Sequence, residues 1–318
     1  MSYNGRFTLI VLFAVVLGGC NSPVSSIPTP TNTAAPGTVE AGQKPTIIAT
    51  TTQIADVLSN LVGDRMVVIS LVPRNGDPHE FEPTPEDVKR IADSQAVFKN
   101  GVGLEGWLDK LIEHAGGERP IFDASQGIEL ATIDGAFEEA GRPDPHLWMS
   151  PQKMLLMVDN MVLGLKQLDP ADATTYDTNA ASYKAKLVEL DAYAEKTLGA
   201  IPAERRKLVT AHDAMGYFAA RYQFKIVGAI IPSVSTDAAE TTPKALAVLV
   251  DTIRAEKIPA IFAEVSVNPK FIEQVAAEAQ VKVVPDLYID SLGDSGSEAG
   301  TYLDLFRTNV DKIAAALR

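Results

Sequence analysis

Three of the four histidines in this chain stand in short polar contexts with restricted backbone. The tripeptide Asp-Pro-His occurs twice, at 77–79 and 144–146, and a third histidine stands in Thr-Ala-His-Asp at 210–213. Proline fixes its own φ and pushes the preceding residue toward extended backbone, so each tripeptide presents its imidazole on a stiff peptide. Neutral imidazole is the commonest side-chain ligand for divalent transition metals. A single histidine is more often an ordinary surface or core residue, but three in such contexts predict a metal site: His79, His146 and His212.

A helix start is the expected support of the third histidine. Residues 210–213 fit the Ser/Thr-x-x-Asp/Glu capping-box pattern, which places His212 in the first turn of a predicted helix at 213–221. The positive end of the helix dipole disfavours imidazolium. We therefore expect this position to keep the ring of His212 neutral and able to bind a metal.

A tetrahedral metal shell needs a fourth ligand. Asp290 follows the last predicted strand and opens a loop rich in Gly and Ser, which makes it the candidate. Spacing alone does not distinguish it from Asp286 or Asp294. The remaining histidine, His114, ends an amphipathic helix before a Gly-Gly pair, and we interpret it as a partner of the helix dipole rather than a ligand.

Length and charge narrow the class of protein. A chain of 318 residues exceeds what one hydrophobic core usually supports, so two domains are expected. The formal net charge is −13. This charge argues against nucleic acid as a partner, because phosphate binding needs clustered Lys and Arg.

The N-terminus carries an export signal. Arg6 precedes an apolar run at 7–17 that is too short to cross a bilayer and fits the h-region of a secretory signal. Small residues lead from this run to Cys20, the only cysteine in the chain, and Leu17–Cys20 resembles the lipobox of bacterial lipoproteins. The alternative is an ordinary signal peptide with an incidental cysteine. We expect an exported, disulfide-free protein, anchored to the bacterial cell membrane by a lipid on Cys20.

Residue patterns divide the chain into segments. The signal peptide at 1–20 precedes a flexible linker at 21–45, whose Pro, Ser, Thr, Ala and Gly cannot bury enough surface to offset ordering entropy. Short apolar runs alternate with amphipathic helices at 46–170 and again at 204–318. This alternation predicts two α/β lobes, each with a mainly parallel sheet flanked by helices. A long polar helix at 171–203 joins the lobes, and a cleft between lobes is where small ligands bind.

The expected elements follow from the same patterns. The strands are 46–50, 66–72, 96–99, 207–209, 225–229, 260–263 and 282–284. The helices are 53–61, 85–92, 105–114, 173–198, 213–221, 243–254, 269–278 and 301–317.

A glycine-rich segment offers a second interpretation of the first lobe. Gly-x-Gly-x-x-Gly at 101–106 follows a predicted strand and opens a predicted helix, and Asp123 ends the next apolar stretch. This is the context of a dinucleotide-binding turn. An exported protein meets little NAD, however, and the simpler interpretation is a tight strand-to-helix turn that needs glycine.

Several segments taken together resemble a known family. The stretches at 76–88, 144–151, 211–218, 262–269 and 290–291 are similar to signature segments of the metal-binding lipoproteins of ABC importers for zinc and manganese, the cluster 9 family of solute-binding proteins. The likeness covers essentially residues 46–318. It implies two α/β lobes bridged by one long helix, with the ligands divided equally: His79 and His146 from the first lobe, His212 and Asp290 from the second.

Two departures from the family pattern bear on the metal. Many zinc-specific members carry a histidine-rich acidic loop, whereas residues 133–142 here include acids but no histidine. Several manganese members have Glu where this chain has His212. Three imidazoles and one carboxylate favour zinc on ligand softness, although relatives with this set take either metal.

The resemblance implies a lipid-anchored solute-binding protein, not an enzyme, that delivers Zn²⁺ or Mn²⁺ to an ABC permease. The chain has no Gly-rich Lys-Ser/Thr loop for nucleotide phosphates, so the permease and its ATPase are separate chains. Nothing in the sequence calls for more than a monomer. Two alternatives stay open at this stage: a zinc-dependent hydrolase or hydratase, whose metal keeps one position for water, and an adhesin that a metal stabilises.

Overall fold

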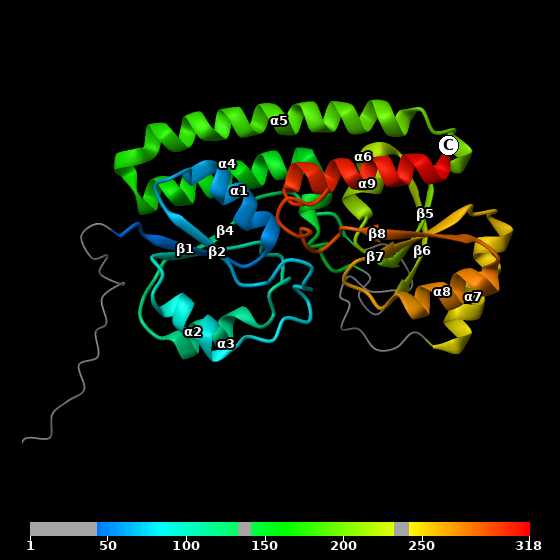
Figure 1. Cartoon of the computed structure of the whole chain (residues 1–318), viewed down its shortest axis with the longest axis horizontal. Helices are drawn as coiled ribbons and strands as arrows, with labels where there is room; N and C mark the ends of the chain where they lie inside the picture. Colours follow the sequence, from blue (N-terminus) through cyan, green and yellow to red (C-terminus); the bar gives the residue numbers. More distant parts are fainter. Residues whose placement is uncertain (1–42, 133–140, 232–241) are drawn as a thin grey trace, which may run out of the picture. The chain divides into compact units, whose positions relative to one another are not determined.

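The computed structural model describes residues 43–132, 141–231 and 242–318 (Figure 1). The predicted signal peptide, Cys20, the linker up to residue 42 and the acidic residues at 133–140 lie outside these ranges. Among the helices in the described ranges, none is both long and apolar enough to cross a membrane.

Parallel strand pairs form the framework of both lobes. One sheet of the first lobe has the order β2-β1-β3-β4, and every neighbouring pair in it is parallel. In the second lobe β5 pairs with β6 and β7 with β8, again in parallel, and β5 lies beside β7. The strands are β1 (Thr46–Ala49), β2 (Val67–Ser70), β3 (Ala96–Lys99), β4 (Ile121–Asp123), β5 (Lys207–His212), β6 (Lys225–Ile231), β7 (Ala260–Glu264) and β8 (Lys282–Leu287).

Helices follow most of the strands, because parallel neighbours need crossover connections. Four of them (α2, α4, α7 and α8) begin with proline in the first turn, preceded by a Ser, Thr or Asn whose side chain accepts a hydrogen bond from a backbone N–H of that turn. Such starts are readable from sequence. The helices are α1 (Thr52–Val62), α2 (Pro85–Ala92), α3 (Leu108–Ala115), α4 (Pro151–Leu168), α5 (Ala173–Gly199), α6 (Gly216–Tyr222), α7 (Pro243–Ala255), α8 (Pro269–Ala279) and α9 (Tyr302–Leu317).

The predicted fold class is confirmed, with local differences. The helix at 85–92 and the strand at 96–99 have the predicted bounds. The short strand β4 was not expected, and α3 begins at Leu108 rather than at residue 105. The side chain of Glu105 explains the later start, because it accepts hydrogen bonds from Asn100 and Gly101 in the preceding turn.

Alternating side chains give each sheet two apolar faces. In β1, Ile48 packs in a cluster with residues of α2 and α3, whereas its neighbours Ile47 and Ala49 point to the core that contains α1 and α4. In the second lobe, Ile261 packs with α7 and α8, whereas Phe262 joins the core on the opposite face. Period-two alternation with both faces covered is the expected form of a parallel sheet.

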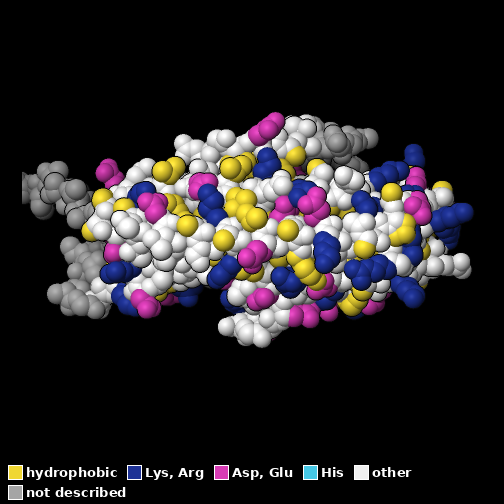
Figure 2. Space-filling model, turned by 90° about the horizontal axis from the view of Figure 1, so that it is seen from above, with side chains coloured by type: hydrophobic (Ala, Val, Ile, Leu, Met, Phe, Trp, Pro, Cys, Tyr) yellow, Lys and Arg dark blue, Asp and Glu magenta, His cyan; other side chains and the backbone are white. Residues whose placement is uncertain are grey.

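The long helix α5 runs along the core that both lobes share (Figure 1). Its buried residues form a stripe from Tyr176 to Leu198, which packs against α1, α4, α6 and α9. Lys, Arg, Asp and Glu are interspersed on the face seen in Figure 2, and ion pairs such as Lys184 with Asp159 link α5 to α4. Exposed pairs of this kind contribute little, so apolar packing holds α5 in place.

The prediction that His212 lies in the first turn of a helix is wrong. His212 is the last residue of β5, where it pairs with Ile231 of β6, and α6 begins only at Gly216. The Thr210 hydroxyl donates to the carbonyl oxygen of His212 at 2.7 Å instead of capping a helix. Pairing with β6 satisfies the backbone here, so tertiary structure overrides the local capping pattern. His212 consequently stands at the carboxyl end of a parallel strand, the usual place for ligand contacts in α/β proteins.

We predict that Gly164→Ala destabilises the protein by about 1–3 kcal/mol. Alanine usually stabilises a helix interior relative to glycine. At this position in α4, however, a Cβ atom would lie 2.8 Å from ring atoms of both Phe98 and Phe122. Urea unfolding measures the change. The control is Gly199→Ala at the end of α5, where the added Cβ meets no atom within 4 Å. A Gly164→Ala protein as stable as the wild type would contradict this packing argument.

Candidate metal centre

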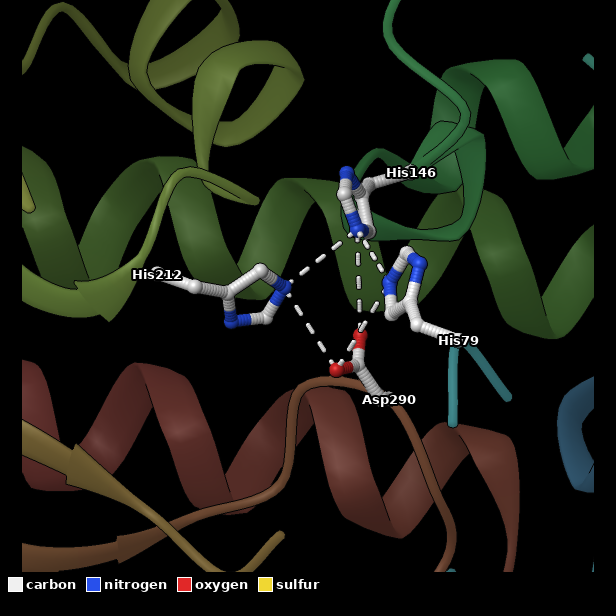
Figure 3. A group of neighbouring side chains, drawn as sticks. All are labelled: His79, His146, His212 and Asp290. Carbon is white, nitrogen blue, oxygen red and sulfur yellow. Dashed lines mark hydrogen bonds and ion pairs between the residues drawn. The ribbon is translucent and has the colours of Figure 1, made fainter. Parts of the chain in front are cut away.

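Four side chains converge where segments of the two lobes meet (Figure 3). His79 comes from the loop after β2, His146 from the loop before α4, His212 from the end of β5 and Asp290 from the loop after β8. One candidate ligand atom from each lies within 4.8 Å of all the others. The structure therefore brings together the four residues that the sequence singled out.

The ligand atoms are closely spaced. Nε2 of His146 lies 3.3 Å from Nε2 of His79 and 3.4 Å from Nε2 of His212. The carboxylate of Asp290 lies 3.4 Å from Nε2 of His212, 3.8 Å from that of His146 and 4.0 Å from that of His79. Three imidazole nitrogens and a carboxylate thus face one small common space.

Carboxylates behind two of the imidazoles determine which ring nitrogen faces that space. Nδ1 of His146 donates to Asp144 at 2.7 Å, and Nδ1 of His212 donates to Glu264 at 2.6 Å. A proton on Nδ1 leaves the lone pair of a neutral ring on Nε2, so Nε2 is the atom that each of these rings offers to an ion at the centre when the ring is neutral. Such outer carboxylates orient metal-binding histidines and raise their basicity.

The two Asp-Pro-His tripeptides fold alike. The carboxylate of Asp77 accepts a hydrogen bond from the backbone N–H of His79 at 2.8 Å, and Asp144 accepts the equivalent bond from His146 at 2.9 Å. Each aspartate therefore closes an Asx turn over the intervening proline. The stiffness expected from proline is thus reinforced by a hydrogen bond to the histidine backbone.

Burial and mutual charge set the protonation of the metal-free centre. The side chains of His146, His212 and Asp290 are fully buried, and that of His79 is nearly so. Burial, with neighbouring imidazoles, lowers the pKa values of His79 and His146 well below the usual range. Burial alone would lower the pKa of His212, but Glu264 and Asp290 raise it to about 10. The expectation that a helix dipole keeps His212 neutral is therefore wrong for the metal-free protein.

The other candidates lie away from the cluster. His114 is exposed in the last turn of α3, in agreement with its interpretation as a dipole partner. Asp286 is exposed within β8, and Asp294 is exposed and accepts a hydrogen bond from the side chain of Asn75 at 2.8 Å. Of the three aspartates between which spacing did not distinguish, only Asp290 faces the histidines.

Sequence reasoning assigned no role to Glu264. It ends the buried strand β7 and contacts His212 twice, because its carboxylate also accepts a hydrogen bond from the backbone N–H of His212 at 3.1 Å. A carboxylate at the end of an otherwise apolar strand is the signal that could have revealed it. Charged groups are rarely buried without a partner.

The glycine-rich turn at 101–106 is a structural turn. The backbone N–H groups of Asn100 and Gly101 donate to the carboxylate of Glu105 at 2.6 and 3.1 Å, so they are not free to bind a phosphate. Gly101 has φ +89°, and a Cβ there would lie 2.2 Å from the Asp123 carboxylate. Glycine is therefore required by the turn itself, which supports the simpler of the two interpretations.

Solved structures share this fold. The chain matches the periplasmic zinc binding protein TroA from Treponema pallidum with a TM-score of 0.80 and 30% identity, covering 86% of this chain and 99% of that one. A manganese-bound mutant of a periplasmic metal binding protein from Candidatus Liberibacter asiaticus gives a TM-score of 0.79 at 27% identity, covering 86% and 100%. Fold and centre together define a two-lobed metal-binding protein of the periplasmic type.

The chain belongs to the ZnuA family, described as zinc-uptake complex component A, periplasmic, whose model matches residues 47–316. The metal ABC transporter substrate-binding lipoprotein ScbA of Streptococcus cristatus is 32% identical over 319 residues, with 98% of each chain covered. The manganese ABC transporter substrate-binding lipoprotein PsaA of Streptococcus mitis is 32% identical over 318 residues, also with 98% of each covered. The predicted resemblance to metal-binding lipoproteins of ABC importers is confirmed.

We predict that binding of one divalent ion releases at least one proton between pH 7 and 8. Below its raised pKa of about 10, His212 is protonated in the metal-free protein, whereas His79 and His146 are already neutral. Burial raises the pKa of Asp290 to about 8, so this carboxyl is partly protonated as well. Metal affinity should therefore fall at least about tenfold for each unit that the pH decreases in this range, since at least one proton competes with the ion. Calorimetric titration in buffers of different ionisation enthalpy counts the protons. Binding without proton release would show that His212 is neutral beforehand.

Proposed function

We propose that this protein is the extracytoplasmic metal-binding component of an ABC importer, which captures Zn²⁺ or Mn²⁺ between its lobes and delivers it to a permease. The metal ligands in this proposal are three imidazole Nε2 atoms and one carboxylate: His79, His146, His212 and Asp290. The spacing of these atoms is the observation that carries the proposal.

That spacing fits a tetrahedral ion. With Zn–N bonds of about 2.05 Å, neighbouring ligands of a tetrahedral zinc ion lie about 3.3 Å apart. The separations from His146 to His79, from His146 to His212 and from His212 to Asp290 are 3.3, 3.4 and 3.4 Å. Two longer separations, 3.8 and 4.0 Å, join the Asp290 carboxylate to His146 and His79, and a small movement of that side chain would shorten them. The ligand atoms of His79 and His212 lie within 4.8 Å of each other.

The carboxylate of Asp290 also calls for a cation. It is fully buried, and within the described part of the chain neither of its oxygens has a hydrogen-bond donor. An ionised carboxylate out of water is costly unless an opposite charge lies close to it. The imidazolium of His212, whose Nε2 lies 3.4 Å from this carboxylate, supplies that charge in the metal-free protein, and a divalent ion bound by all four side chains supplies more of it.

The arrangement supports binding rather than catalysis. A catalytic zinc keeps one position open for water and has a general base beside it. Here four side chains fill a tetrahedral shell. Further carboxylates nearby accept hydrogen bonds from the same histidines, Asp144 and Glu264 from imidazole Nδ1 atoms and Asp77 from the backbone N–H of His79. We infer that the protein is not an enzyme.

The N-terminal sequence and the names of the similar proteins support a location outside the cytoplasm, at the membrane. Lipid on Cys20 anchors the protein outside the cytoplasm, in line with the relatives' names as lipoproteins. The linker at 21–45 precedes a monomeric body made of a first lobe at 46–170, a connecting helix at 171–203 and a second lobe at 204–318. A permease and its ATPase, as separate chains, are the partners.

We predict that His146→Ala lowers the affinity for Zn²⁺ and Mn²⁺ by more than about 100-fold, because even groups behind metal ligands contribute 10–100-fold. Isothermal titration of the soluble body, without the first 42 residues, measures this. His114→Ala is the matched control, since His114 is exposed and lies outside the cluster. Equal losses in the two variants, or no binding of either metal by the wild type, would overturn the proposed function.

Direct competition between Zn²⁺ and Mn²⁺ determines which ion the protein binds more tightly. Metal analysis of protein purified without chelator, followed by displacement of bound Mn²⁺ with Zn²⁺, compares their affinities in one sample. A His212→Glu variant is informative here, because the family resemblance implies Glu at this position in several manganese-binding members. A harder carboxylate ligand in place of imidazole should move the preference toward Mn²⁺.

We predict that Cys20→Ser moves the exported protein from the membrane fraction to the medium or periplasm. The substitution removes the only thiol that could carry a lipid and leaves the apolar export signal unchanged. Fractionation of bacteria that express each form measures the distribution. Retention of Cys20→Ser in the membrane fraction would show that another feature holds the protein there.

A further inference from the structure

The backbone carbonyl immediately before each of three proposed metal ligands accepts a hydrogen bond from a side-chain N–H group. These are the carbonyl oxygens of Pro78, Pro145 and Ile289, which precede His79, His146 and Asp290. We propose that the donors, Trp107, Asn100 and Trp148, are positioning residues that fix three of the four ligands as one unit. The inference rests on the proposed function and adds residues that do not themselves touch the metal.

Trp107 fixes the first Asp-Pro-His loop. Its indole Nε1 donates to the Pro78 carbonyl at 2.9 Å, and its ring packs edge-on against Phe81 with centroids 4.7 Å apart. The peptide between Pro78 and His79 is planar, so its carbonyl and the Cα of His79 move together. The indole therefore restrains the orientation of the residue that carries the first imidazole.

Asn100 fixes the second Asp-Pro-His loop. Its Nδ2 donates to the Pro145 carbonyl at 3.0 Å, and the asparagine is fully buried. The buried carboxylate of Glu105 restrains Asn100 in turn, because it accepts the Asn100 backbone N–H at 2.6 Å and the Thr50 hydroxyl at 2.6 Å. Asn100 and Trp107, the residues immediately before and after the glycine-rich turn at 101–106, thus supply the donors to both Asp-Pro-His loops.

Trp148 fixes the loop of Asp290. Its indole Nε1 donates to the Ile289 carbonyl at 2.7 Å, and Gln53 donates to the same oxygen at 3.4 Å. Both donors belong to the first lobe, although Asp290 follows β8 of the second. Thr52 of the first lobe also accepts the Leu292 backbone N–H at 2.9 Å. The Asp290 loop is therefore bonded to the lobe that carries His79 and His146.

His212 is fixed differently. Its partner Glu264 ends β7, which lies beside β5 in the second lobe. These hydrogen bonds tie Asp290 to the lobe of His79 and His146, so the restraints on the ligands do not divide two to two as the family resemblance implies. The second lobe also contacts the His146 loop, because the Tyr217 hydroxyl of α6 donates to the Asp144 carbonyl at 2.9 Å. His212 alone among the four is held by a carboxylate of the second lobe.

Replacement of single donors tests the proposal, with Co²⁺ alone as the probe. Trp107→Phe removes the indole N–H and keeps an aromatic ring beside Phe81. Asn100→Asp keeps the size of the side chain and removes its N–H donor. We expect each variant to bind Co²⁺ about 10-fold or more weakly. We also expect its Co²⁺ absorption spectrum to differ from the wild type, because the geometry around the ion is altered.

A matched control separates positioning from general stability. Nδ2 of Asn160 donates to the carbonyls of Ala124 and Gln126 at 2.9 Å each, in the same lobe but away from every proposed ligand. Asn160→Asp therefore removes the same kind of hydrogen bond and should leave Co²⁺ affinity and spectrum unchanged. Thermal unfolding without metal reports the structural cost of each variant. If Asn100→Asp does not fold, the Trp107→Phe variant alone tests the proposal, because Trp107 is partly exposed and its replacement is better tolerated.

Double variants distinguish a role of Trp107 in positioning His79 from a purely structural role. Because Trp107 acts through His79, Trp107→Phe should cause no further loss of affinity when His79→Ala is already present, but should still cause one beside His146→Ala. A wild type that binds no Co²⁺ or Zn²⁺ would overturn the proposed function. A wild type that binds normally, with Trp107→Phe equal to Asn160→Asp in affinity and spectrum, would overturn the positioning role alone.

Discussion

The structure depends on four electron-rich atoms that face one another in a space shielded from water. Three imidazole nitrogens and a carboxylate lie 3.3 to 4.0 Å apart along the measured pairs, and water has almost no access to them. Such groups repel one another unless a positive charge lies among them, and the protonated His212 provides one in the metal-free protein. The surrounding chain must still supply enough stability and rigidity to hold this arrangement ready for the proposed ion.

Rigidity comes from polar groups that surround the four proposed ligands. Asp144 and Glu264 accept hydrogen bonds from the rings of His146 and His212, and indole or amide N–H groups donate to the backbone next to three of the four residues. These groups are buried or partly buried, where hydrogen bonds are strong and unpaired groups costly. Behind them, the apolar core along α5 connects both lobes. A preorganised centre binds its ion without first ordering the side chains.

Local signals account for what the sequence could predict. Proline next to histidine marked the two loops of the proposed ligands His79 and His146, and the helix at 85–92 was predicted with the bounds that α2 has. The placement of His212 failed because its capping pattern is local, whereas pairing with β6 determines that the segment is a strand. The choice of Asp290, and the roles of Glu264 and Trp107, depend on contacts between residues far apart in the sequence. Contacts between residues far apart in the sequence produce no motif or periodicity that a single sequence would reveal.

X-ray absorption at the zinc edge of the loaded protein tests the central claim most directly, because it counts imidazoles around the ion without any substitution. The expected result is a single zinc site with four nitrogen or oxygen neighbours at about 2.0–2.1 Å. Three of these neighbours should show the outer-ring scattering of imidazole. One imidazole or none, or a shell of oxygen atoms from water, would contradict the assignment of the centre.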